Sequence, residues 1–398
     1  MVARRYPHSK IVKCNLAFCP FNCIFASQMA GLYIHIPFCK SRCIYCGFYS
    51  TTAIKLRQQY VDAVVKEMKT RNGNINTIYL GGGTPSQLTT DQLRQLLEAA
   101  HIYNKVEADA EVTIEVNPDD VTEQFAYELG QLSVNRVSMG VQTFCDERLR
   151  FLHRRHTAAQ VMTAIDRLRK AGIQNISIDL MYGFPGETLT DWESDIDIAL
   201  TLGVEHLSAY CLMVEEGTPL YQLKLKHEDF KASFPDEELE RQMYELLIDR
   251  LEDGGYEHYE ISNFARPSFR SRHNTSYWNG TPYIGLGAAA HSYDGVCCRR
   301  WNIADVQQYM RAIEDGEPCY EEEHLDEDTR YNDVVTVALR TREGLDLTTL
   351  SDKHRNYCLK NAQRFIDDHL LTYSNDHLSL TRRGLFVSDM VMSELMLV

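Results

Sequence analysis

Short β-branched and apolar runs alternate with amphipathic stretches along the chain from Leu32 onward. Apolar residues at helical spacing predict helices at residues 54–70, 89–103, 119–132, 157–172 and 188–203. The runs between them predict strands at residues 32–36, 77–80, 111–116, 136–141, 176–182 and 206–212. This alternation is typical of parallel βαβ units. Six units predict an α/β fold, a complete or partial (β/α)6 barrel with helices outside and chemistry at the carboxyl ends of the strands.

The second half of the chain follows a less regular pattern. Residues 216–263 predict one long helix, a turn and a short strand, and residues 272–293 are rich in glycine and aromatic side chains. The acidic run at residues 314–330 is typical of a solvated linker. Beyond it, a helix, a hairpin turning at Ser374 to Asp376 and a final helix predict a small winged-helix-like α+β module. The expected regions are an amino-terminal extension (1–30), a barrel (31–265), a connecting region (266–315) and a carboxyl-terminal domain (316–398).

Composition narrows the class of protein. The net charge is -15, which argues against nucleic acid or an anionic membrane surface as a partner, because either requires a basic face. The same charge opposes a nucleic-acid-binding role for the carboxyl-terminal module. No apolar run is long enough to span a bilayer. Twelve cysteines in 398 residues are typical of an intracellular metal protein rather than a disulfide scaffold, so we expect a cytoplasmic protein.

The opening segment differs from the rest of the chain. Residues 1–28 combine a basic start with a short apolar, cysteine-rich stretch, but lack the small-x-small cleavage site of a signal peptide. Met29 stands just before the first predicted strand, so we favour a translation start that was assigned too early. A second metal site at Cys14, Cys19 and Cys23 is disfavoured, because no local pattern supplies a further ligand.

Three cysteines lie close together after the first predicted strand, as Cys39, Cys43 and Cys46 in a C-x-x-x-C-x-x-C pattern. A [4Fe-4S] cluster normally takes one thiolate per iron, so three thiolates leave one iron open. Structural zinc requires four ligands, and no matching C-x-x-C pair follows, since Cys297 and Cys298 are adjacent. An open iron can chelate the amino and carboxylate groups of S-adenosyl-L-methionine (SAM), whose carbon–sulfur bond one electron then cleaves. The pattern therefore predicts a cluster that binds SAM.

The stretch "YIHIPFCKSRCIYC" resembles the radical SAM superfamily, and within it the family of the anaerobic coproporphyrinogen III oxidase HemN and the haem chaperone HemW. The resemblance covers nearly the whole chain from about Gly31. It implies a partial (β/α)6 TIM-like barrel and a [4Fe-4S] cluster on Cys39, Cys43 and Cys46. It further implies that SAM is bound by Tyr33, Tyr45, Gly82, Gly83, Thr84, Glu115, Gln142, Arg154 and Asp179. Of these, Tyr45 matches the adenine contact and the "GGGTP" residues match the contact to the methionyl amino group.

Two features separate the branches of this family. The oxidase carries a further cysteine two places after its last cluster cysteine, and this chain has Phe48 there. Residues 273–278 read H-N-x-x-Y-W, which resembles the HemW pattern and implies a haem site at His273, Tyr277 and Trp278. A lone histidine in a glycine-rich loop is more often a hydrogen-bonding residue than an iron ligand, and both readings of His273 stay open. His35 is expected to shape the cysteine loop.

The resemblance thus implies a haem chaperone with haem as its cargo. It also implies an acceptor haemoprotein that the sequence does not identify, an electron donor such as flavodoxin or ferredoxin, and transient contact with membrane respiratory proteins. The alternative is an oxygen-independent coproporphyrinogen III oxidase, a radical SAM enzyme that forms protoporphyrinogen IX by oxidative decarboxylation. Phe48 argues against that activity.

Overall fold

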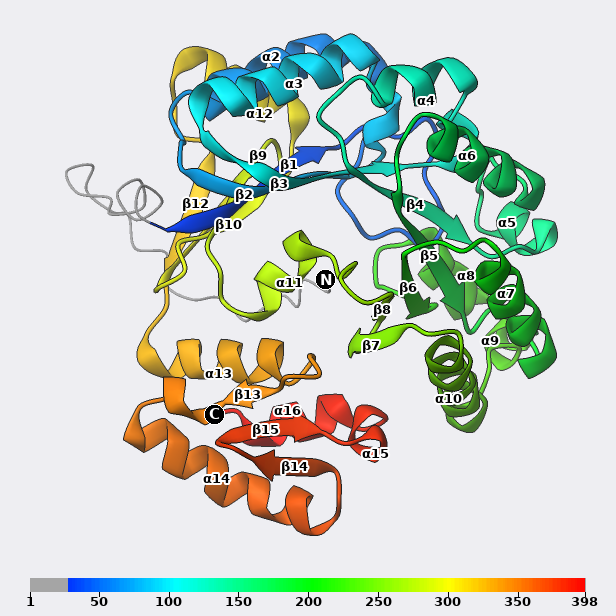
Figure 1. Ribbon diagram of the computed structural model, residues 1–398, viewed down its shortest axis with the longest axis vertical. Coiled ribbons are helices and arrows are strands. Elements are labelled where there is room, and N and C mark those ends of the chain that lie inside the picture. Colours follow the sequence, from blue (N-terminus) through cyan, green and yellow to red (C-terminus); the bar gives the residue numbers. More distant parts are fainter. Residues whose placement is uncertain (1–27, 398) are drawn as a thin grey trace.

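Six parallel strands form the centre of a single curved sheet in the computed structural model, which describes residues 28–397 (Figure 1). They lie in chain order, each hydrogen-bonded to the next. The six strands are β1 (Met29–Ile36), β2 (Asn74–Gly82), β3 (Lys105–Val116), β4 (Arg136–Gln142), β5 (Asn175–Tyr182) and β6 (His206–Cys211). The α/β fold with a partial barrel, predicted from the alternating pattern, is confirmed.

Helices cover the outer, convex face of this sheet, as predicted (Figure 1). They and their short 3-10 turns are η1 (Ile54–Leu56), α2 (Arg57–Met68), η2 (Pro85–Gln87), α3 (Thr90–Tyr103), η3 (Pro118–Asp120), α4 (Glu123–Leu129), α5 (Asp146–Phe151), α6 (Ala158–Lys170) and α7 (Leu189–Thr201). Thr89 and Thr188 each begin a helix with a capping box, which satisfies amide groups of the first turn.

The two faces of the strands differ in chemistry. On β4, Val137 and Met139 belong to the main hydrophobic core, whereas Arg136 and Ser138 alternate with them and belong to the opposite, concave face. The concave face therefore carries polar side chains where the convex face carries apolar ones. A polar interior is suited to a ligand with many hydrogen-bonding groups.

Further strands extend the sheet at both edges, in the order β12-β11-β10-β9-β1 on one side and β6-β8-β7 on the other. β9 pairs with β1 in parallel, and the remaining pairs are antiparallel. These strands are β7 (Glu257–Glu260), β8 (Asn263–Ala265), β9 (Tyr283–Leu286), β10 (His291–Tyr293), β11 (Cys298–Asn302) and β12 (Tyr320–His324). The helices α11 (Arg272–Trp278) and α12 (Val306–Asp315) lie between them in the chain.

Two expectations from the sequence are wrong here. The acidic run contains an edge strand instead of a linker, because Glu322 and Glu323 pair with Arg300 and Arg299 across β11 and β12. The long helix expected within residues 216–263 is three helices, α8 (Pro219–Lys226), α9 (Glu228–Ala232) and α10 (Glu237–Asp253). Pro235 and the N-cap Asp236 start α10 afresh, since proline cannot continue a helix.

The carboxyl-terminal domain has its own small antiparallel sheet, in the order β13-β15-β14, and its own hydrophobic cluster. The predicted hairpin is confirmed, with Asn375 and Asp376 at positive φ in its turn. Its elements are α13 (Glu327–Ala338), β13 (Leu345–Asp346), η4 (Leu347–Thr349), α14 (Asp352–Asp367), β14 (Leu371–Ser374), β15 (His377–Leu380), α15 (Arg382–Leu385) and α16 (Ser388–Leu395).

Arg340 joins this domain to the barrel. Its guanidinium donates to the buried Glu260 at 2.8 Å and lies 4.9 Å from the centre of the Trp278 ring on α11. Helix α11 in turn lies on the concave side of the sheet, between the barrel strands and the carboxyl-terminal domain (Figure 1). The H-N-x-x-Y-W residues are thus part of the contact between the two domains.

Residues 28–397 contain no helix that is both long and apolar enough to cross a membrane. The expectations for the amino-terminal segment, including Cys14, Cys19 and Cys23, fall outside this described range.

Candidate cluster and SAM site

The three cysteines lie in one loop at the carboxyl end of β1. The loop returns to its starting point through hydrogen bonds from the Cys39 amide to the Thr51 carbonyl, at 3.0 Å, and from the Thr51 amide to the Pro37 carbonyl, at 2.7 Å. His35 helps to hold it, because its Nε2 lies 3.2 Å from the Tyr49 carbonyl oxygen, as expected from the sequence. All three thiols are free and partly exposed. The loop therefore carries all three cysteines at the carboxyl end of the first barrel strand, and within residues 28–397 no three His, Cys, Asp or Glu side chains already form a metal-holding group.

Burial raises the pKa of the Cys39 and Cys46 thiols, that of Cys46 to about 11, and the neighbouring cysteines raise them further. Three thiolates in one short loop need a strong positive partner. Iron supplies that charge, so this donor set fits a three-thiolate [4Fe-4S] cluster.

Two polar side chains approach the sulfurs, one from just after β2 and the other from the loop between α5 and α6. Thr84 Oγ1 lies 3.5 Å from Cys39 Sγ, and Arg154 Nη1 lies 3.7 Å from Cys43 Sγ. Arg154 also donates to Asn117 Oδ1 at 2.7 Å, which fixes the direction of its guanidinium. Thr84 and Arg154, both predicted from the sequence, therefore lie beside the cysteine loop.

The glycine motif packs against the end of β1. A Cβ atom at Gly82, whose φ is +111°, would lie 2.3 Å from the His35 ring. A Cβ atom at Gly83 would lie 2.8 Å from the Pro37 carbonyl carbon. These positions need glycine because β1 and the loop approach so closely.

Glu115 and Asp179 project into the polar interior from β3 and β5. Glu115 accepts hydrogen bonds from the Tyr79 hydroxyl at 2.8 Å and the Gly82 amide at 3.0 Å, and Ser138 donates to Asp179 at 3.4 Å. Burial raises the pKa of Glu115 to about 7 and that of Asp179 to about 6, despite these hydrogen bonds. Two partly buried carboxyls that titrate near neutrality can accept hydrogen bonds from ligand hydroxyl groups.

Replacing Glu115 with Gln should remove part of the pH dependence of stability. The pKa of Glu115 is higher in the folded chain than its ordinary value of 4.5, so the free energy of unfolding falls as pH rises from about 4.5 to 7. The parent should therefore lose on the order of 3 kcal/mol of its free energy of unfolding across that interval, and the variant should not show this loss. Urea denaturation of the ligand-free proteins at pH 5 and pH 8 measures this, with Glu123→Gln on exposed α4 as control. Parallel pH profiles for parent and variant would contradict the expectation.

Gln142 adopts a strained backbone at the end of β4. Its φ is +71°, and the pairing with β5 shifts register between Gly140 and Gln142. The following residues are held by Asp195 of α7, which accepts from the Thr143 hydroxyl at 2.5 Å and the Phe144 amide at 3.0 Å. The sequence analysis missed Asp195. The available signal was an acidic residue within the buried stripe of α7.

Arg136 is a second residue that the sequence analysis missed. It lies at the start of β4, is 1% exposed, and its Nε and Nη1 have no hydrogen-bond partner among the described residues. Its positive charge lowers the pKa of Glu115 and Asp179, which offsets part of the effect of burial. The interior thus holds one buried cation against two partly buried acids.

The two predicted SAM tyrosines lie in different surroundings. The Tyr33 hydroxyl is 2.9 Å from His35 Nδ1, and its ring stacks with Tyr79 at a centroid distance of 6.1 Å. Tyr45 packs against a small hydrophobic cluster that includes Ile44. Burial raises the pKa of Tyr45 beyond its ordinary range, so this hydroxyl stays protonated. Tyr45 lies in the cysteine loop itself, whereas Tyr33 belongs to the interior.

His273 is fully buried and both of its ring nitrogens have partners. Nδ1 lies 2.8 Å from Thr77 Oγ1, and Nε2 lies 2.9 Å from the Tyr277 hydroxyl. Burial, with the nearby Arg136, lowers the pKa of His273 to about 3, so the ring is neutral. Axial ligation of haem by His273 stays a prediction, and it requires the ring to give up one of these hydrogen bonds.

Comparison with known proteins shows which families and proteins this chain resembles. Residues 33–199 match the model of the radical SAM superfamily, and residues 325–387 match the model of the HemN C-terminal domain. The chain is 37% identical to the protein named heme chaperone HemW from Bacillus subtilis, over 82% of this chain and 87% of that protein. It is 34% identical to heme chaperone HemW from Mycobacterium tuberculosis, over 93% and 95% of the two chains.

Among solved structures, the coproporphyrinogen III oxidase HemN from Escherichia coli superposes with a TM-score of 0.79. The superposition covers 94% of this chain and 92% of that chain at 22% sequence identity. At this sequence identity, the superposition shows that the two proteins share a fold.

Proposed function

The chain belongs to the radical SAM family of the heme chaperones HemW, and from that premise we propose that it binds haem and transfers it to an acceptor haemoprotein. We further propose that Cys39, Cys43 and Cys46 hold a [4Fe-4S] cluster and that SAM binds to it exchangeably. The observation that carries the cluster assignment is the single loop with three free thiols, approached by Thr84 and Arg154.

In this proposal a bound cluster supplies one-electron chemistry at an iron that the protein leaves open. Arg154 pairs with the carboxylate of SAM, because its guanidinium is already aimed at the sulfurs by Asn117. Gly82, Gly83 and Thr84 place backbone and hydroxyl groups beside the methionyl amino group.

The remaining predicted residues hold the nucleoside part of SAM. Glu115 and Asp179 accept hydrogen bonds from the ribose hydroxyls, and Tyr45 packs on the adenine. Gln142 presents its side chain from the strained end of β4, which Asp195 keeps in place. Tyr33 is assigned a place against SAM on family resemblance, and its contacts with Tyr79 and His35 support a position in the interior.

Phe48 favours the chaperone over the oxidase. It occupies the position where the oxidase of this family carries a further cysteine, and its side chain is 55% exposed. A phenylalanine can neither ligate metal nor transfer a proton. The proposed function therefore contains no decarboxylation step.

Anaerobic reconstitution with iron and sulfide, followed by two separate assays, tests the proposal. Titration with haem should give stoichiometric binding and transfer to an apo-haemoprotein. Coproporphyrinogen III with SAM and a reductant should give no vinyl product. Formation of protoporphyrinogen IX would identify the oxidase instead, and absence of haem binding would refute the chaperone.

A further inference from the structure

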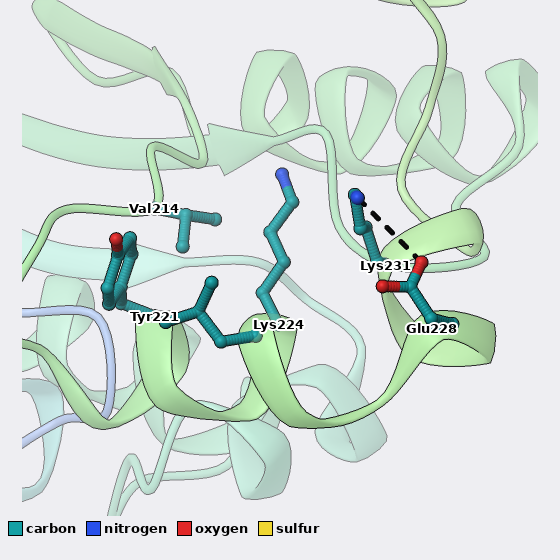
Figure 2. Close-up of a pocket in the computed structure, with 6 residues that line it drawn as sticks. Val214, Tyr221, Lys224, Glu228 and Lys231 are labelled. Atoms are coloured by element: carbon teal, nitrogen blue, oxygen red, sulfur yellow. Dashed lines mark ion pairs between the residues drawn. The ribbon is translucent and has the colours of Figure 1, made fainter.

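Polar groups next to the proposed SAM site are arranged in two different ways. Helices α8 and α9, which contact the cysteine loop through the Leu220 amide and the Ile44 carbonyl at 3.0 Å, line a cavity of about 260 Å³ (Figure 2). Lys231 pairs with Glu228 at 3.7 Å in the wall of this cavity, and both side chains are exposed. That ion pair is local, whereas a longer set of polar contacts in the interior crosses between the two domains.

Four polar side chains connect the carboxyl-terminal domain to the interior of the barrel. Arg340 donates to Glu260 Oε1 from Nη2 at 2.8 Å and from Nε at 3.1 Å. Asn263 Nδ2 donates to the other oxygen of Glu260, and the Ser208 hydroxyl donates to Asn263 Oδ1 at 2.9 Å. Glu260, Asn263 and Ser208 are 2%, 4% and 3% exposed. The side chains of Arg340, Glu260, Asn263 and Ser208 are here named the polar relay.

The polar relay ends at Asp179. Ser208 on β6 and Asp179 on β5 are register partners, and their side chains interact. The Tyr210 hydroxyl also interacts with Ser208 and can donate to it. Ser138 approaches the Asp179 carboxyl from the other side, from β4, at 3.4 Å. The relay therefore leads from the carboxyl-terminal domain to an acid that is proposed to accept hydrogen bonds from the ribose of SAM.

The hydrogen bonds of the polar relay all run in one direction. Glu260 only accepts: from Arg340, from the Ser262 amide at 3.1 Å and from Asn263. Only the side-chain nitrogen of Asn263 can donate to Glu260, so the side-chain oxygen of Asn263 faces Ser208. The single hydrogen of the Ser208 hydroxyl then points to Asn263, and its lone pairs are left for other neighbours. Ser208 thus does not compete with a ligand for the carboxyl oxygens of Asp179.

We propose that the polar relay lets the carboxyl-terminal domain control the affinity for SAM, with Arg340 as a positioning residue that keeps the Asp179 carboxyl open to the ligand. This inference rests on the proposed SAM site. Without the charge of Arg340, the amide of Asn263 is free to turn over. Ser208 then directs its hydrogen at Asp179, and a ribose hydroxyl has to displace that hydrogen bond before it can bind.

Calorimetry of SAM binding to the full-length, anaerobically reconstituted protein tests the proposal. R340M should weaken SAM binding about tenfold, because one competing hydrogen bond has to be displaced. S208A removes the competing hydroxyl group. In an S208A background, R340M should therefore change the SAM affinity by less than about twofold. A merely structural role of Arg340 predicts no such rescue.

The backbone contact between the two domains does not depend on the Arg340 side chain. The Ile261 amide donates to the Arg340 carbonyl at 3.0 Å, and the Arg342 amide donates to the Tyr259 carbonyl at 3.1 Å. These hydrogen bonds should hold the carboxyl-terminal domain against β7 in R340M. The loss of SAM affinity is then an effect of the relay and not of a detached domain.

R270M is the matched control. The side chains of Arg270 and Arg340 are 31% and 30% exposed, and Arg270 pairs with Glu343 at 2.7 Å across the same contact between the domains. Its other charged partner is Glu257, at 3.1 Å, and neither glutamate belongs to the polar relay. R270M should leave the SAM affinity within about twofold of the parental value.

N263A covers the case in which R340M misfolds, because it interrupts the polar relay and keeps the ion pair of Arg340 with Glu260. It should weaken SAM binding about as much as R340M does. Equal losses in R340M and R270M, no loss in N263A, or no rescue by S208A would overturn the proposal. The iron and sulfide content should be equal in all variants. Failure of the parental protein to bind SAM with its cluster in place would instead refute the proposed function.

Discussion

Replacing Cys46 with Ser is expected to abolish the [4Fe-4S] cluster. Three thiolates already leave one iron without a protein ligand, and a serine hydroxyl is a poor substitute for a thiolate at a second iron. Apart from Cys39 and Cys43, no cysteine of the described chain lies in this loop, so none can replace the lost sulfur locally. The iron and sulfide content after anaerobic reconstitution should fall from about four of each per chain to a small remainder.

Cys145 provides the control, because it is free and partly exposed but lies after β4, outside the loop. Cys145→Ser should keep the visible absorbance and electron paramagnetic resonance signal of the cluster. A full cluster in the Cys46 variant would show that the three-thiolate assignment is wrong. Loss of the cluster in both variants would point to a general effect on folding.

Replacing His273 with Ala is expected to be the most destabilising single change near the interior. The substitution removes a fully buried ring and leaves the hydroxyl groups of Thr77 and Tyr277 without these partners. A large-to-small change in a core, with two lost hydrogen bonds, should lower the free energy of unfolding by about 3–5 kcal/mol. Urea denaturation measures this loss directly.

Tyr277→Phe separates the structural role of His273 from iron ligation. The substitution removes the hydrogen bond between the Tyr277 hydroxyl and His273 Nε2 but keeps the aromatic ring of residue 277. It should therefore lower the free energy of unfolding by about 1 kcal/mol. If His273 ligates haem through that nitrogen, Tyr277→Phe should keep or tighten haem binding, whereas His273→Ala should weaken it and shift the Soret band. Unchanged haem spectra in folded His273→Ala protein would remove this residue from the ligand set, while a stability loss below 1 kcal/mol would contradict the structural role.

The sequence was sufficient for the parts of the fold that have strong periodicity. All six parallel strands and five of the helices between them follow from β-branched runs and helical spacing, whereas the short helix α5 was not predicted. The cysteine loop, the glycine motif and the acids on β3 and β5 were placed near one another because parallel strands share a carboxyl edge. The structure adds contacts that spacing alone does not contain, such as the 3.7 Å approach of Arg154 to Cys43.

The features that were missed depend on distant pairing. β9 and β12 are short strands whose composition, glycine-rich in one case and acidic in the other, argues against a strand when read locally. They form because β1 and β11 offer hydrogen-bonding edges. Arg136 and Asp195 were overlooked because one charged residue in a strand or a helix is ordinarily assigned to the surface.

The parallel pairing of β1 with β9 has a consequence for biosynthesis. Gly31 to Ile34 face Tyr283 to Leu286, about 250 residues later in the chain. The ribosome releases the strand that leads into the cysteine loop long before its second neighbour exists, and such distant strand pairing forms slowly. Iron and sulfide delivered to a nascent chain would meet an unfinished scaffold. We therefore expect insertion of the proposed cluster to follow translation, when β9 has paired with β1.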